Sequence, residues 1–119
     1  MGNHSTARGK VVLVNFPFGD LLASKVRPAV CLTHPIGSYT HVILALISSR
    51  IPSDLLETDF IINTSHEDFS GTGLKVTSTL RLHRLMTVTT SLCQRELGEF
   101  SPGILGEVDD KLKKLFCIK

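Results

Sequence analysis

The sequence predicts a mainly β fold: a small, partly open, five-stranded antiparallel barrel with one C-terminal helix at about residues 101–116. Three observations lead to this prediction. Five short runs of apolar and β-branched residues, typical of strands, alternate with polar loops. No segment between these runs has the length of a crossover helix, which argues against a parallel α/β sheet. Only the last segment carries apolar residues at helical spacing.

Length and composition indicate one globular domain. A chain of 119 residues, 42% apolar and 20% charged, is long enough to bury a core and too apolar to be disordered. Residues 1–9 are polar, so we expect a flexible N-terminal arm there. A single domain is expected over residues 10–119.

The first four strands are expected at residues 10–16, 28–33, 40–48 and 57–64. The third run, THVILALIS, shows no alternation of apolar and polar residues. Such a continuous apolar run is typical of a strand that is covered on both faces. We therefore expect this strand to lie in the middle of the barrel sheet.

The loop between the first two strands, residues 18–26, is predicted to carry function. It is polar, contains Asp20 and Lys25, and is followed at once by Arg27 and Pro28. Loops held by a rigid strand scaffold often present binding residues. Arg27 is therefore a cation at the root of a candidate functional loop.

The fifth strand is expected at residues 75–84, with a short extension to residue 88. Its side chains fall into two sets, Val76, Ser78, Leu80 and Leu82 on one face and Thr77, Thr79, Arg81 and His83 on the other. Strict alternation predicts that Arg81 and His83 share a polar face.

The last segment begins with a helix start signal. Ser101 is a suitable N-cap and Pro102 suits the first helical position. Its apolar residues at helical spacing are Leu105, Val108, Leu112, Leu115 and Phe116. Acidic residues in its first half and lysines in its last half complement the helix dipole.

The net charge of +2, from 13 basic and 11 acidic residues, does not by itself indicate nucleic-acid binding. The distribution of charge says more. No acid lies between Phe69 and Gln94, and Asp20 is the only acid between Met1 and Arg50. A fold that joins these two regions has a locally positive surface.

The three cysteines, Cys31, Cys93 and Cys117, do not have the spacing of a zinc site, and their odd number argues against a disulfide framework. Free thiols favour a reducing compartment, so we expect a cytoplasmic protein. No apolar run reaches the ~18 residues of a membrane span, so no membrane partner is expected.

Four stretches of the chain, in the same order, resemble the MazF/PemK (Kid) family of toxin ribonucleases. They are VVLVNFPFGDLLASKVRPAVCL at residues 11–32, ALISS at 45–49, GLKVTSTLRLHRL at 73–85 and RELGEFSPGILGEVDDKLKKLF at 95–116. The resemblance covers about residues 9–117. It implies an SH3-like barrel, a homodimer, and an endoribonuclease of a type II toxin–antitoxin system that cleaves single-stranded RNA without a cofactor. It also implies an antitoxin protein whose C-terminal segment occupies the RNA groove.

Position by position, the resemblance implies roles for individual residues. The catalytic ones are Arg27, Ser48, Arg81 and His83, which stand where the family carries Arg, a hydroxyl residue, Arg and Asp. The further residues expected to contact RNA are Phe18, Asp20, Lys25, Ser49, Arg50 and Ser78.

These residue types suit RNA cleavage without a metal, in which the neighbouring 2′-hydroxyl is the nucleophile. This reaction needs a base, a cation on the phosphate oxygens, and an acid for the leaving oxygen. Arg27 offers a planar donor fork that matches phosphate, and Ser48 can donate one more hydrogen bond. Arg81 would be a second cation. His83 would exchange a proton near neutral pH, which Asp does less readily.

Each residue also has an ordinary structural interpretation. The alternative for Arg81 is a cross-strand partner of an acidic residue, and Ser49 competes with Ser48 for the hydroxyl role. Phe18 fits core filling as well as base stacking, and Asp20 and Lys25 fit a role in shaping their loop. These alternatives stay open at the level of sequence.

His83 is the point at which the chain departs from the family pattern. The departure favours an alternative function, a non-catalytic barrel that binds RNA or a protein partner. A toxin with another target is a third possibility, because SH3-like barrels host several functions.

Overall fold

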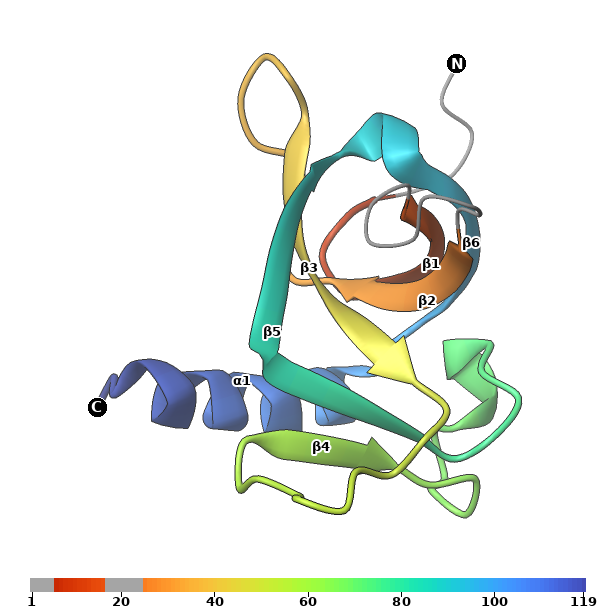
Figure 1. Ribbon diagram of the computed structural model, residues 1–119, viewed down its shortest axis with the longest axis vertical. Coiled ribbons are helices and arrows are strands. Elements are labelled where there is room, and N and C mark those ends of the chain that lie inside the picture. The colour runs from red at the N-terminus through yellow and green to blue at the C-terminus, as the bar shows by residue number, and fades with distance from the viewer. Residues whose placement is uncertain (1–5, 17–24) are drawn as a thin grey trace.

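A computed structural model, which describes residues 6–16 and 25–119, shows one curled antiparallel sheet and a C-terminal helix (Figure 1). The strands are β1 (Lys10–Phe16), β2 (Lys25–Cys31), β3 (His41–Ser48), β4 (Asp59–Ile62), β5 (Ser78–Thr89) and β6 (Cys93–Glu99). The helices are α1 (Pro102–Phe116) and two short 3-10 turns, η1 (Ser70–Thr72) and η2 (Thr90–Leu92). The strand order in the sheet is β4-β5-β3-β2-β1-β6. The predicted mainly β, partly open antiparallel barrel with a terminal helix is confirmed.

The sheet has six strands, so the prediction of five was wrong by one. The additional strand, β6, pairs only with β1 and lies at the edge of the sheet. Its sequence, CQRELGE, is largely exposed, and its register with β1 shifts twice. An exposed edge strand with bulges has neither an apolar face nor a regular period of two, which is why sequence patterning missed it.

The central strands are covered on both faces, as the apolar run of β3 predicts. In that strand Leu44 belongs to one buried cluster and its neighbour Ala45 to the other. Val11 and Val12 of β1 divide in the same way. One cluster lies under α1, and the other lies inside the curl of β1, β2 and β6. Each fully buried aliphatic side chain stabilises the fold by about 1.5–3 kcal/mol.

Helix α1 begins as predicted. The Ser101 hydroxyl accepts a hydrogen bond from the Ile104 N–H at 3.2 Å, and Pro102 is the first helical residue. The same hydroxyl donates to Asp68 Oδ2 at 2.7 Å, which ties the helix start to the loop before η1. No helix in the described part of the chain has both the length and the hydropathy needed to cross a membrane.

The described part of the predicted N-terminal arm, residues 6–9, lies against the barrel. The Gly9 N–H donates to the Cys31 carbonyl at 2.7 Å, and the Gly9 carbonyl accepts from the Phe100 N–H at 2.8 Å. Arg8 makes an ion pair with Asp109 of α1, with 2.6 Å between Nη2 and Oδ1. Through these contacts, residues 6–9, which precede Lys10, are part of the packed fold.

The backbones of β6 and η1 lie too close together at Gly98 to leave room for a side chain. A Cβ at Gly98 would lie 2.6 Å from the Thr72 carbonyl carbon, against backbone rather than a flexible side chain. We expect Gly98→Ala to lower the free energy of unfolding by about 1–3 kcal/mol. Gly106→Ala is the matched control, because nothing lies within 4 Å of its Cβ on α1. It should stabilise the helix by about 0.5–1 kcal/mol. Urea denaturation measures both, and equal midpoints for the two variants would contradict the packing.

Candidate functional site

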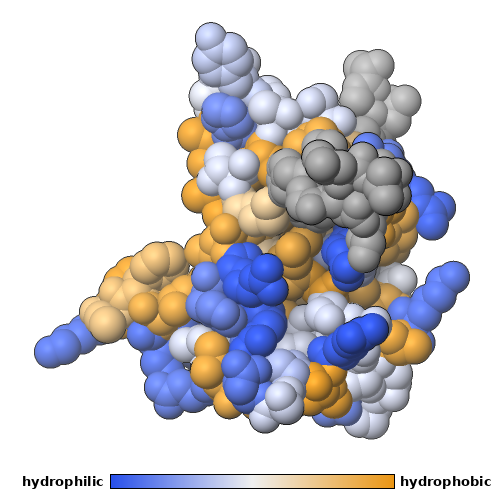
Figure 2. All heavy atoms as spheres, viewed as in Figure 1, coloured by the Kyte–Doolittle hydropathy of each residue, from blue (hydrophilic) through white to orange (hydrophobic). Residues whose placement is uncertain are grey.

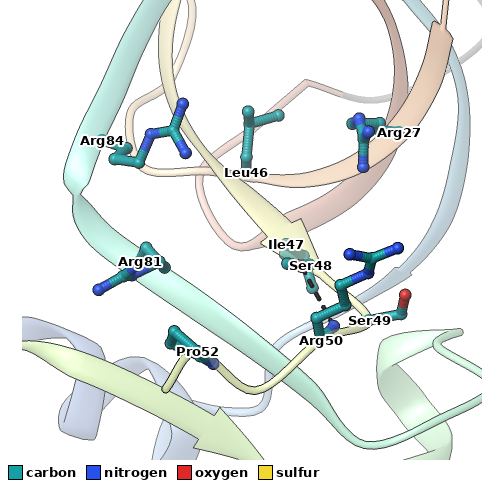
Figure 3. Close-up of a pocket in the computed structure, with 9 residues that line it drawn as sticks. All are labelled: Arg27, Leu46, Ile47, Ser48, Ser49, Arg50, Pro52, Arg81 and Arg84. Carbon is teal, nitrogen blue, oxygen red and sulfur yellow. Dashed lines mark hydrogen bonds between the residues drawn. The ribbon is translucent and has the colours of Figure 1, made fainter. Parts of the chain in front are cut away.

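A groove of about 720 Å³ lies where β2, the end of β3 and the middle of β5 meet (Figure 3). It is lined by Arg27, Leu46, Ile47, Ser48, Ser49, Arg50, Pro52, Arg81 and Arg84. Four of these nine residues are arginines, two are serines and none is acidic. The groove therefore joins the two acid-poor parts of the sequence and presents cations and hydroxyl groups together.

On the surface around the groove, hydrophilic residues lie among apolar ones, and the apolar Leu46 and Ile47 line the groove itself. Figure 2 shows hydrophilic residues gathered over β3 and β5 on this face, while apolar residues are exposed at the C-terminal end of α1. A second hollow, of about 290 Å³, has the opposite charge and is lined by Glu67, Asp68, Ser70, Gly71, Glu99 and Ser101. A polyanion is therefore attracted to the first groove and repelled by the second. Within residues 6–16 and 25–119, no cluster of three His, Cys, Asp or Glu side chains is arranged to hold a metal ion.

Arg27 and Ser48 reach the groove from neighbouring strands. Ala29 of β2 pairs with Leu46 of β3, and the same antiparallel register continued by two residues leads to Arg27 and Ser48. Arg27 is exposed, so its guanidinium is available to a ligand. The Ser48 hydroxyl accepts a hydrogen bond from the Arg50 N–H at 3.1 Å, which leaves its proton free to be donated.

Arg81 lines the groove, but its charge is matched by two acids. Its Nε–H donates to Asp59 Oδ1 at 3.1 Å, and its Nη1 lies 3.5 Å from Asp54 Oδ1. Arg81 and Asp59 are paired residues of β5 and β4, so the cross-strand partner interpretation describes what the structure shows. In Figure 3 the Arg81 side chain points away from Arg27 and Arg50.

The Asp59 carboxylate, which accepts the hydrogen bond from Arg81, is fully buried, with 0% of its side chain exposed. Burial raises the pKa of Asp59, but three favourable interactions outweigh it. They are the hydrogen bond from Arg81, the hydrogen bond from the Leu56 N–H at 2.9 Å, and the charges of Arg81 and His83. The pKa of Asp59 is therefore held below its ordinary value, and the carboxylate keeps the charge that neutralises Arg81.

The alternation of β5 is broken beside the groove. Ala45 pairs with Leu85 and Ile47 pairs with Leu80, so Leu46 alone lies opposite residues 81–84 of β5. A bulge of this kind changes which way side chains point. Arg84 therefore lines the groove although strict alternation would place it on the opposite face from Arg81.

His83 is a predicted catalytic residue that the groove lining does not include. It is exposed on β5. Strict alternation of β5 predicted a face shared by Arg81 and His83; the charges of both act on Asp59, but only Arg81 lines the groove. Arg84 was missed because strict alternation places it on the opposite face from Arg81, and no signal in the sequence marks the three additional residues of the bulge.

The other residues expected to contact RNA divide into three groups. Ser49 and Arg50 line the groove. Ser78 does not, because it is buried, with 3% exposed, and its hydroxyl donates to the Val76 carbonyl at 2.8 Å. Phe18, Asp20 and the side chain of Lys25 lie outside the described residues.

Solved structures of the same shape are known. The chain is similar to the Mycobacterium tuberculosis toxin MazF-mt6 with a TM-score of 0.70 and 16% identity, over 92% of this chain and 98% of that one. It is similar to an endoribonuclease in complex with its cognate antitoxin from a Mycobacterial species with a TM-score of 0.68 and 13% identity, over 95% and 96%. It is also similar to the MazE-MazF structure from Deinococcus radiodurans with a TM-score of 0.66 and 18% identity, over 95% and 97%. At these identities the likeness shows a shared fold.

Comparison at the level of sequence shows the family. No curated protein sequence matches the chain. A family model for the PemK-like, MazF-like toxin of type II toxin–antitoxin systems matches residues 7–116, which is nearly the whole chain. The chain therefore belongs to the PemK-like, MazF-like toxin family.

Proposed function

We propose that the protein is a toxin endoribonuclease that cleaves single-stranded RNA in the groove lined by Arg27, Ser48 and Arg84. The observation that carries the proposal is the composition of this groove, with four arginines, two serines and no acid among its lining residues. Phosphate diesters are bound by such donors, and arginine forks match their oxygens. Membership of the toxin family and the endoribonuclease neighbours support the proposal.

In this proposal the RNA 2′-hydroxyl attacks the neighbouring phosphorus and the bond from that phosphorus to the 5′ oxygen breaks, which leaves a 2′,3′-cyclic phosphate and a 5′-hydroxyl. Water takes up the 2′ proton and supplies the proton for the leaving 5′ oxygen, and no metal takes part. Arg27 binds the phosphate oxygens and stabilises the charge that builds on them, and the Ser48 hydroxyl donates one further hydrogen bond. Arg50 neutralises the phosphate charge of the RNA strand that enters the groove. Arg81 keeps the wall of the groove in place through its ion pair with Asp59.

Transfer of the 2′ proton is not assigned to a groove residue. His83 is the proton-exchanging side chain among the four proposed catalytic residues, and it lies outside the groove lining. This observation favours a second candidate function, a barrel that binds RNA or a protein partner without cutting. The two candidates differ in one measurable property, which is cleavage.

The test uses purified protein and a long single-stranded RNA, once in EDTA and once in Mg²⁺. The proposed function predicts cleavage at equal rates in both conditions, and no cleavage of the same RNA with 2′-O-methyl groups throughout. Binding of RNA without cleavage in either condition would instead establish the second candidate. Cleavage that requires Mg²⁺ would overturn the metal-free mechanism.

The His83→Asp variant tests the role of the imidazole. Because His83 does not line the groove, we expect this variant to retain cleavage within about tenfold of the parent. General acid–base catalysis by one side chain contributes about 100- to 10,000-fold, so a role for His83 would appear as a loss of that size. The rate is measured from pH 5 to pH 9 on one RNA. A large loss with a changed pH profile would show that the imidazole exchanges the proton.

The proposed partners follow from the same groove. Antitoxin complexes among the structural neighbours support an antitoxin partner for this chain, and an acid-free groove suits an acidic antitoxin segment. We also propose a homodimer in the cytoplasm, as the family resemblance implies. Sedimentation of the purified protein with and without an added antitoxin peptide distinguishes these assemblies.

A further inference from the structure

The groove contains an arginine that the proposed reaction does not use. Arg84 lines it from β5, is exposed, and makes no ion pair with any residue in the described part of the chain. Arg81, three residues earlier, is neutralised by Asp59 and Asp54. On this wall of the groove, therefore, Arg84 rather than Arg81 has a charge that a ligand can use.

The position of Arg84 is produced by the bulge of β5. One residue of β3, Leu46, lies opposite four residues of β5, and this irregularity brings both Arg81 and Arg84 to the groove. Bulges beside binding sites commonly re-aim a side chain in this way. An arginine that merely kept the surface soluble would not need such a distortion.

Arg84 and Arg27 stand on opposite walls. The strand order places β3 between β5 and β2, so the two arginines reach the groove from strands on opposite sides of β3. In Figure 3 the Arg84 and Arg27 side chains lie on either side of Leu46. An RNA strand that crosses the groove meets one cation at each wall, with the apolar Leu46 side chain between them.

We propose that Arg84 binds the phosphate adjacent to the one that is cleaved, so that an RNA longer than a dinucleotide is bound more tightly and cleaved faster than a dinucleotide. This inference rests on the proposed function, in which Arg27 and Ser48 hold the scissile phosphate. Arg84 thereby becomes a substrate-positioning residue that selects for chain length. Its contact is to the backbone, so it adds affinity without base preference.

Binding to an uncleavable RNA tests the contact itself. A labelled octanucleotide with 2′-O-methyl groups is titrated with the parent, Arg84→Met, Arg84→Lys and Arg95→Met at several salt concentrations. One lost phosphate contact should weaken binding about tenfold or more and reduce the slope of log K against log salt by about 0.7. Arg84→Lys should keep the slope, because it keeps the charge. Arg95 is the matched control, since it is exposed on β6 and does not line the groove.

Cleavage of two substrates tests which phosphate is bound. We expect Arg84→Met to lower kcat/KM about tenfold on an octanucleotide and less on a dinucleotide, which has only the scissile phosphate. Thermal unfolding confirms that each variant is folded. An unchanged salt slope in Arg84→Met, or an equal loss on both substrates, would overturn the inference. If the parent binds RNA but cleaves neither substrate, the proposed function fails, and the salt slopes still decide whether Arg84 contacts a phosphate.

Discussion

Arg27→Ala is expected to reduce RNA cleavage about 100- to 1,000-fold, the usual effect of removing one preorganised donor from developing charge. Arg27 is the cation that reaches the groove beside Ser48. Arg27→Lys keeps the charge but loses the planar fork, so its rate should lie between those of the parent and Arg27→Ala. Single-turnover cleavage of one RNA in EDTA measures all three.

The control for this comparison is Arg95→Ala, which removes the same side chain from an exposed position on β6 outside the groove. We expect the control to cleave at the rate of the parent. The variant Arg27→Ala should unfold at the same temperature as the parent, because Arg27 is exposed. Cleavage by Arg27→Ala at the parent rate would remove Arg27 from the reaction.

The largest effect on stability is expected from Asp59→Ala, which should lower the free energy of unfolding by about 3 kcal/mol at pH 7. The Asp59 side chain is 0% exposed and accepts hydrogen bonds from Arg81 and from the Leu56 N–H. Asp54→Ala is the matched control, because Asp54 contacts the same arginine but is 75% exposed. Exposed ion pairs contribute little, so the control should change stability by less than about 1 kcal/mol. Similar urea midpoints for the two variants would show that the buried pair does not stabilise the fold.

The same pair predicts a dependence on pH. Since the pKa of Asp59 is lowered in the folded protein, its stabilisation is fully present above its unfolded value of about 3.9. That stabilisation is lost as the pH falls through the lower folded value. The difference in stability between the parent and Asp59→Ala should therefore be constant near neutral pH and shrink in acid. Denaturation at a series of pH values measures it, and a difference that grows in acid would reverse the sign assigned to Asp59.

Most of the fold is encoded in patterns that sequence reasoning can detect. The apolar run at 40–48 predicted a strand with both faces covered, and Leu44 and Ala45 lie in separate buried clusters. Ser101 and Pro102 predicted the helix start to the residue. Strand β6 could not be predicted from the sequence. Most of its side chains face solvent, and its bulges remove the regular alternation of side chains between the two faces.

The candidate site is predicted less completely, for a physical reason. Arg27, Ser48 and Arg50 line one groove, where the family resemblance places them, and the antiparallel register of β2 and β3 brings Arg27 and Ser48 to the same level. Arg84 lines the groove and the predicted His83 does not, because three additional residues in β5 interrupt its pairing with β3 between Leu80 and Leu85. Such an irregularity depends on tertiary packing and leaves no local mark in the sequence.

The chemistry of the cleaved ends tests the central claim most directly. A single-stranded RNA is incubated with the parent protein in EDTA, and the products are identified by mass spectrometry. Attack by the 2′-hydroxyl, stabilised by Arg27 and Ser48, predicts fragments that end in a 2′,3′-cyclic phosphate and begin with a 5′-hydroxyl. Fragments with a 3′-hydroxyl and a 5′-phosphate, or an RNA that stays intact while bound, would contradict this account.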